Sequence, residues 1–257
     1  MSDQILMSEM TWVDYAERLE KSETVVYLPV GAVEQHGPHL PLGTDWMLAL
    51  AVAKGAASRT KGIVASPLSY GYKSQCYSGG GNHFVGTTSL DGHTLSSVVS
   101  DVLQEVARHG ARQICLVDIH FENHWFITEG CDLASRELQR SGYGKVRMIK
   151  PRLDAICDMD MITSFYEPGT FPGMALEHAG KVETSIMLYL YPELVHQDRY
   201  PEPLIAKVPP YDEYPINPQG VPESGALAPV GDASVEMGQA LYEDLVDGFV
   251  RCVRSAF

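Results

Sequence analysis

An almost continuous apolar run, QICLVDI at residues 113–119, most constrains what this chain can fold into. Such a run is typical of a strand that is buried on both faces of a parallel sheet. A second run, VVYLPV at residues 25–30, and weaker ones at residues 62–68 and 145–151 predict further strands. Apolar residues at helical spacing, with glycines after the helix ends, predict helices at residues 8–21, 44–58, 93–109, 125–141, from 183 onward and 231–254. This alternation predicts an α/β fold with a mostly parallel sheet flanked by helices.

Two segments do not fit this alternation. Residues 69–92 are rich in glycine and serine, and a long loop of this kind in a compact domain is usually functional when it is ordered. Residues 196–230 hold eight prolines, which exclude a helix or a central strand there. We expect an arm packed on the surface or a contact between subunits. No internal repeat or boundary is visible, so we expect residues 1–257 to form one domain.

Charge and cysteine usage narrow the class of protein. The net charge of −14 argues against nucleic acid or an anionic membrane as a partner, because such binding needs a basic surface. The five cysteines are odd in number and form no CxxC pair, as expected of reduced thiols in the cytosol. The first residues lack the features of a signal peptide, and no apolar run reaches eighteen residues. We therefore expect a cytoplasmic protein without a membrane partner.

Residues of the types that bind metal ions occur in pairs just after two of the predicted strands. Glu34 and His36 follow the strand at residues 25–30, and His120 and Glu122 follow the strand at residues 113–119. In extended backbone, residues i and i+2 point to the same side, so each pair can aim at one point. Open α/β proteins bind ligands at this carboxyl edge. Asp45, at the start of a predicted helix, can join them or can be an ordinary helix cap.

These five side chains exceed the four ligands of one closed metal site. Either pair alone is more often a solvated or hydrogen-bonded group, but their occurrence at two strand ends favours a binuclear site with Asp45 as the bridge. Mixed nitrogen and oxygen ligands suit Zn²⁺ or Mn²⁺. Two such ions activate a water and polarise a carbonyl, which is hydrolytic chemistry.

Long motifs in this chain resemble the creatininase family, the creatinine amidohydrolases. They are PVGAVEQHGPHLPLGTD, YGYKSQCYSGGGNHFVGTTSLDG, VARHGARQICLVDIHFEN, EHAGKVETSIMLYLYPELV and PPYDEYP, and they cover almost the whole chain. The resemblance implies one α/β domain with a mostly parallel sheet, two divalent metal ions per chain and a homohexamer.

The resemblance also divides the ligands between the two ions. Glu34, His120 and the bridging Asp45 hold one ion, whereas His36, Glu122 and the same Asp45 hold the other. His39, in the same loop, has no matching partner elsewhere and is left out of the site.

Further positions of the site follow from the same resemblance. Ser78 matches the serine that contacts substrate, and His178 matches the histidine that shuttles a proton. Glu183 has the expected role of orienting a ligand. We also place Phe121 among the expected substrate contacts. Without the motif, His178 would be interpreted as a hydrogen-bonded core histidine.

The chain departs from the family where creatinine-hydrolysing members stack the substrate ring on tryptophans. Asp154 and Met174 occupy these positions, and Ala175 replaces the aspartate that usually follows. The loss of two rings weakens the case for creatinine itself. Asp154 can form a polar substrate wall together with Lys150 and Arg152, or all three can belong to a solvated strand end.

The predicted function is a two-metal hydrolase that opens a small cyclic substrate at a C–N bond, with creatinine to creatine as the reference reaction. Glu122 and the metals stabilise the oxyanion, and His178 delivers a proton to the leaving nitrogen. The alternative reaction is hydrolytic ring opening of a keto-inositol, as in a 3-dehydro-scyllo-inosose hydrolase. A non-catalytic binding protein on the same fold is the alternative from another class.

Overall fold

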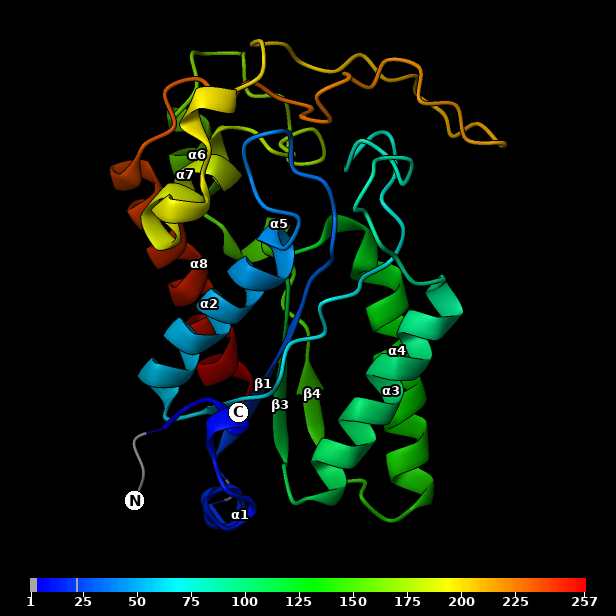
Figure 1. The fold of residues 1–257 in the computed structure, drawn as a ribbon. Helices are drawn as coiled ribbons and strands as arrows, with labels where there is room; N and C mark the ends of the chain where they lie inside the picture. The colour runs from blue at the N-terminus through cyan, green and yellow to red at the C-terminus, as the bar shows by residue number, and fades with distance from the viewer. Residues whose placement is uncertain (1–3, 22) are drawn as a thin grey trace.

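The computed structural model describes residues 4–21 and 23–257, and its centre is a parallel sheet of four strands in the order β2-β1-β3-β4 (Figure 1). The strands are β1 (Val25–Val30), β2 (Ile63–Val64), β3 (Gln113–Asp118) and β4 (Arg147–Ile149). The α-helices are α1 (Trp12–Leu19), α2 (Thr44–Thr60), α3 (Gly92–Arg108), α4 (His124–Arg140), α5 (Leu153–Ile156), α6 (Met159–Ser164), α7 (Lys181–Leu190) and α8 (Val235–Ala256). Short 3₁₀ turns occupy Met7–Glu9, Phe121–Asn123, Pro192–Leu194 and Gln197–Arg199. The predicted α/β class is confirmed.

Helices cover both faces of the sheet because its strands are apolar on both faces. Val26, Leu28 and Leu116 pack with α1, α3 and α4 on one face. Tyr27 and Val117 point to the other face and pack with α2 and α8. Figure 1 shows these two layers on either side of β1 and β3.

A third apolar cluster lies beyond the sheet, where α7 packs with α2 and α8. Leu48 of α2, Ile186 of α7 and Leu241 of α8 meet there. The segment with α6 packs on the same cluster through Ile162. This layer positions the expected site residue His178, because α7 begins at Lys181, three residues after His178 and four after Glu177.

The N-terminal helix is shorter than the predicted range of residues 8–21. A 3₁₀ turn ends at Glu9, and α1 begins only after Thr11, whose side chain forms a capping box with Asp14. Trp12 is 82% exposed, so only Tyr15 and Leu19 form the buried stripe. The strand predicted at residues 62–68 is likewise reduced to the two residues of β2.

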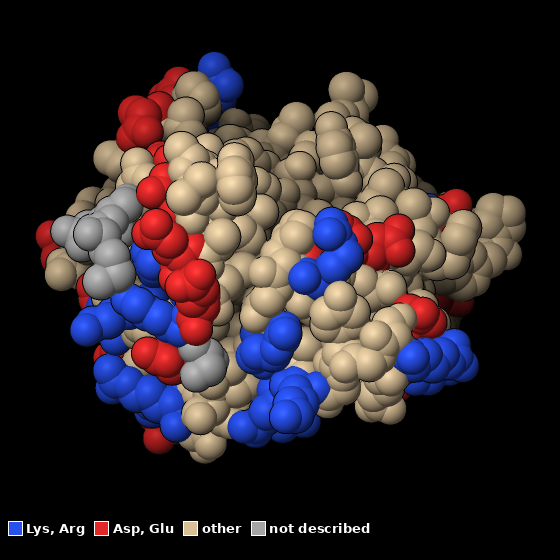
Figure 2. Space-filling model, turned by 90° about the horizontal axis from the view of Figure 1, so that it is seen from below, with Lys and Arg blue, Asp and Glu red and all other residues tan. Residues whose placement is uncertain are grey.

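Residues 200–234 contain no helix or strand, in agreement with their prolines. In Figure 1 this arm runs across the top of the molecule, beside the loop of residues 69–91. At the opposite end, Figure 2 shows acidic and basic side chains side by side. Within the described residues, every helix is too short or too polar to cross a bilayer.

Candidate metal centre and active site

The two predicted ligand pairs lie side by side at the carboxyl ends of β1 and β3. These strands pair in parallel, with Val30 opposite Asp118, so the loops after them leave the sheet together. Gly31 lets the first loop pass close to α2, because a Cβ there would lie 2.3 Å from the Trp46 backbone nitrogen. This close approach brings the start of α2 to the same sheet edge.

Asp45 stands between the two histidines. Its Oδ1 lies 3.1 Å from His36 Nε2, and its Oδ2 lies 3.0 Å from His120 Nδ1. The N-cap of α2 is Gly43, so Asp45 is not the helix cap that was the alternative interpretation. Glu34 completes this side of the site, with its Oε2 3.2 Å from His120 Nδ1.

Backbone carbonyls orient both imidazoles toward this aspartate. His36 Nδ1 donates to the Glu34 carbonyl oxygen at 3.1 Å, and His120 Nε2 donates to the Tyr72 carbonyl oxygen at 3.0 Å. When each ring is neutral, its remaining nitrogen therefore presents a lone pair to Asp45. A carbonyl that holds the far N–H of a histidine is the usual support of a metal-binding imidazole.

The buried carboxylates of this cluster require positive charge. Burial raises the pKa of Glu34, whereas for Asp45 the neighbouring His36 and His120 outweigh burial and hold the pKa well below its ordinary range. Burial alone would lower the pKa of His36, but Asp45 and Glu183 raise it to about 10. Protonated imidazoles thus balance the carboxylates when no metal is bound.

The hydrogen bonding of two buried carboxylate oxygens indicates whether a cation fits in the cluster. Glu34 Oε1 is buried and accepts no hydrogen bond from the described part of the chain, and Asp45 Oδ2, also buried, is paired only when the His120 ring nitrogen 3.0 Å away carries a proton. A buried carboxylate oxygen left in this state is costly unless a cation or donor pairs with it. The donors are nitrogen and oxygen atoms, which suit Zn²⁺ or Mn²⁺. The residues of the cluster are therefore suited to bind a divalent metal ion.

The structure groups the possible ligands differently from the predicted division. Glu34, His120 and Glu122 form one possible metal group, and His36, Asp45 and Glu183 form another. Glu122 lies with its Oε2 3.4 Å from His120 Nε2, and its Oε1 accepts hydrogen bonds from the Ser78 hydroxyl (2.5 Å) and the Gln75 N–H (3.1 Å).

Glu183, expected to orient a ligand, is itself a member of the second possible metal group. Its Oε2 is 3.8 Å from His36 Nε2 and accepts the Ala179 backbone N–H at 2.6 Å. The position of Glu183 in the first turn of α7 places it there. The motif alone gave no distance that could have shown this.

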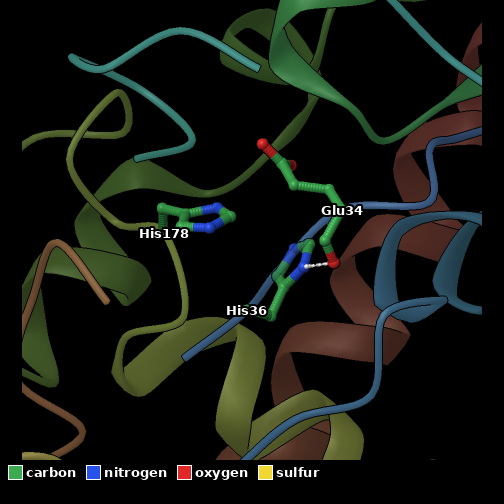
Figure 3. Close-up of side chains that lie close together, drawn as sticks. All are labelled: Glu34, His36 and His178. Carbon is green, nitrogen blue, oxygen red and sulfur yellow. Dashed lines mark hydrogen bonds between the residues drawn. The ribbon is translucent and has the colours of Figure 1, made fainter. Parts of the chain in front are cut away.

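His178 lies beside the cluster, 4.4 Å from the ring of His36 between centroids. Figure 3 shows its ring directed toward the space next to Glu34 and His36, and these three residues form a further possible metal group. His178 Nε2 lies 2.8 Å from the Gln35 carbonyl oxygen and donates to it, so Nδ1 is the nitrogen that can accept a proton. Burial and the neighbouring His36 hold the pKa of His178 well below its usual value, which keeps the ring neutral.

Gln35 is a residue that sequence reasoning missed. Its side-chain amide donates to the carbonyl oxygens of Gly79 and Gly225 and accepts from Gly37. It thereby ties the metal-ligand loop to the glycine-rich loop and to the arm. Its place between Glu34 and His36 could have indicated this role. In extended backbone neighbouring side chains point to opposite sides, so Gln35 is expected to point away from the side that Glu34 and His36 share.

A cavity of about 110 Å³ adjoins the cluster. Ser78, Phe121, Met174 and His178 all line it, together with Glu122. Asp154 is not among the lining residues.

Of the two alternatives for Asp154, the polar wall is not formed in this structure. The side chain of Asp154 is 76% exposed on α5 and lies 3.9 Å from Arg152, which is 65% exposed. Lys150 turns elsewhere, with its Nζ 2.8 Å from His124 Nδ1. The short helix α5 faces the cavity with Leu153 instead, so Asp154 and Arg152 belong to a solvated strand end.

His39 is buried outside the metal groups, as its omission from the site anticipated. Its Nε2 lies 2.9 Å from the Thr184 hydroxyl, and its ring packs edge-on against Tyr200. It therefore joins the loop after β1 to α7.

Comparisons with known proteins agree with this geometry. The creatininase family, described as creatinine amidohydrolase, matches residues 8–253. A creatinine amidohydrolase from Pseudomonas putida is 44% identical over 258 residues, which cover 100% of this chain and 99% of the relative. A solved manganese creatininase superposes with a TM-score of 0.94 at 44% identity, covering 99% of both chains. A Glu-to-Gln mutant creatininase of Zn-Zn type superposes with a TM-score of 0.95 at 44% identity, covering 100% of this chain and 99% of that one. With this match over nearly its whole length and the same fold, the chain belongs to the creatininase family.

Proposed function

We propose that this protein is a metal-dependent amidohydrolase that opens a small cyclic amide by hydrolysis of a ring C–N bond, with creatinine to creatine as the first reaction to test. The observation that carries the proposal is Asp45, whose two oxygens face the two oriented imidazoles of His36 and His120 at 3.1 and 3.0 Å. The creatinine amidohydrolase activity of the 44% identical relative supports the substrate class.

We further propose that the site holds two divalent ions, Zn²⁺ or Mn²⁺. Glu34, His120 and Asp45 hold one of them. His36 and Asp45 hold the other, with the third ligand supplied by Glu122, as the resemblance implies, or by Glu183, as the geometry favours. When bound, such ions lower the pKa of a coordinated water and polarise the amide carbonyl.

The protein's own residues perform the remaining steps. Ser78 and the Gln75 N–H hold Glu122 at the cavity wall, where its carboxylate can orient the attacking water. The neutral His178 accepts the proton of that water at Nδ1 and returns it to the ring nitrogen as the C–N bond breaks. The overall reaction adds OH to the carbonyl carbon and H to the leaving nitrogen.

The alternative substrates are less well supported. The keto-inositol hypothesis rested on a polar wall at Asp154, and this residue is exposed and away from the cavity. A non-catalytic binding protein would not need His178 beside the metal ligands. We therefore propose that the protein is a catalyst. We also propose that residues 1–257 form one domain, that the protein is cytoplasmic and that it assembles as a homohexamer.

The test is to load the metal-free protein with Zn²⁺ or Mn²⁺ and to measure conversion of creatinine to creatine. We expect turnover with about two metal equivalents per chain, and loss of turnover in Glu122→Gln. Two bound equivalents without turnover would refute creatinine as substrate. The metal content of Glu183→Gln is compared with that of Glu122→Gln to identify the third ligand of the second ion. Only the variant that lacks this ligand is expected to bind less metal. The sedimentation coefficient tests the hexamer.

A further inference from the structure

The active-site cavity has an apolar end that the proposed reaction does not use. From the metal cluster the cavity extends to the place where α2, α5, α7 and α8 meet. We call this end the apolar chamber, and its walls are Leu48, Val52, Leu153, Ile186, Leu241 and Leu245.

Most of the walls of the chamber belong to the packed core and not to mobile surface. Leu48, Val52, Ile186 and Leu241 are at most 3% exposed. They pack with the clusters that join α2, α7 and α8. Because these side chains are held by helix packing, they cannot collapse into the space at low cost, so the chamber is a lasting feature of the fold.

The size and chemistry of the cavity favour a carbon-containing ligand over water. Its volume of about 110 Å³ is far above the ~10–15 Å³ that one ordered water needs. Water also needs two or more polar partners, whereas apolar walls leave a cavity dry. Asp244 of α8 also lines the cavity, and its Oδ2 already accepts the Asp158 N–H at 2.8 Å.

Polar groups are concentrated at the other end of the same cavity. His178, Glu122 and Ser78 line it beside the metal ligands, where a reacting carbonyl has to lie. A ligand that satisfies both ends has a polar amide at the metal cluster and an alkyl group that points between the helices. Met174, an unbranched and flexible side chain, lines the cavity and can adjust to such a group.

We propose that the apolar chamber binds an alkyl substituent on the ring of the cyclic amide, so that substrates with a longer substituent than the methyl group of creatinine are preferred. This inference rests on the proposed amide hydrolysis for its orientation of the ligand. It also names the class of substrate more closely, as an N-alkylated cyclic amide or cyclic guanidine.

A homologous series tests the proposal on the unmodified protein. The series is creatinine, its analogue without the methyl group, and the N-ethyl and N-propyl analogues. Each buried methylene is expected to raise the affinity about fourfold. Dissociation constants of the zinc-loaded protein are measured by calorimetry, and kcat/KM is measured in parallel. Affinity that stays flat or falls from methyl to propyl would overturn the proposal.

Separate measurements of binding and of turnover distinguish a failure of this proposal from a failure of the proposed function. If no compound is hydrolysed but affinity rises with chain length, the reaction is wrong and the chamber stands. If creatinine is hydrolysed but neither affinity nor kcat/KM depends on chain length, the chamber is wrong and the reaction stands.

Variants locate the effect in the chamber. Leu245→Phe places a ring into the chamber from a partly exposed position on α8, and we expect it to lower the propyl-to-methyl affinity ratio at least tenfold. Leu153→Phe makes the same change from α5 and serves if the first variant does not fold. Val235→Phe, at an exposed position of α8, is the matched control and leaves the ratio unchanged. An unchanged ratio in both chamber variants refutes the location.

Discussion

Gly79→Ala is the sharpest test of how the glycine-rich loop supports the metal cluster. A Cβ at this position would lie 2.0 Å from Glu34 Oε1 and 2.5 Å from the Ser74 hydroxyl oxygen. Ordinary contact begins at 3.4 Å, so the carboxylate of Glu34 has to retreat by 3.4 minus 2.0, or about 1.4 Å. Glu34 Oε2 is 3.2 Å from His120 Nδ1, and this approach cannot survive such a shift unchanged.

The expected consequence is a loss of metal and activity without loss of the fold. A displacement of about 1 Å at a reacting centre costs roughly 100-fold in rate, and disturbing a ligand's support typically lowers metal affinity 10- to 100-fold. We therefore expect Gly79→Ala to bind zinc at least tenfold more weakly and to lose about 100-fold in kcat/KM. Zinc is titrated against a chelator, and far-ultraviolet circular dichroism checks the fold.

Gly144→Ala is the matched control. A Cβ there would have a single neighbour, Gln139 Cγ at 3.9 Å, so this variant should bind zinc like the unmodified protein. If Gly79→Ala keeps its zinc affinity within twofold and its activity within threefold, Glu34 is not held where the structure places it. The assignment of Glu34 as a ligand would then have to be abandoned.

Three further predictions concern single side chains. Asp45→Asn should hold less than one metal equivalent by elemental analysis and lose at least 100-fold in activity, because one residue contacts both imidazoles; retention of two equivalents would exclude Asp45 as the bridge. His178→Ala should lose 10²- to 10⁴-fold in kcat with its metal content unchanged, as expected of a proton shuttle, and metal loss would make it a ligand instead. Burial lowers the pKa of His39 to about 4, so between pH 6.5 and 4 the unfolded chain binds the proton that the folded chain excludes. The free energy of unfolding should therefore fall by up to about 3 kcal/mol as pH drops through this window, and urea denaturation of His39→Gln should show a smaller fall.

The order of strands and helices could be predicted because each element carries its own pattern. The buried runs at β1 and β3 and the apolar stripe of α3 are local features, and all three were confirmed. The N-terminal helix was overextended because its spacing continues across Thr11, where a capping box starts the helix anew. Capping by side chains overrode the periodicity there.

The positions of Glu34, His36, His120 and Glu122 follow from sequence by simple geometry. Each pair comes directly after a strand, and neighbouring parallel strands end at one edge. The contacts of Glu122 with Ser78 and Gln75 could not be predicted in this way, because the glycine-rich loop has no periodic structure.

The sequence by itself thus determined the fold class, the sheet edge that carries the site and the kind of ligand it offers. These depend on local periodicity and on chain order. Only the tertiary structure decided that Glu183 approaches His36, that Asp154 faces solvent and that the cavity ends in an apolar chamber. The physical reason is that each of these depends on how α5, α7 and α8 pack against α2, and no pattern within one segment encodes such packing between distant helices.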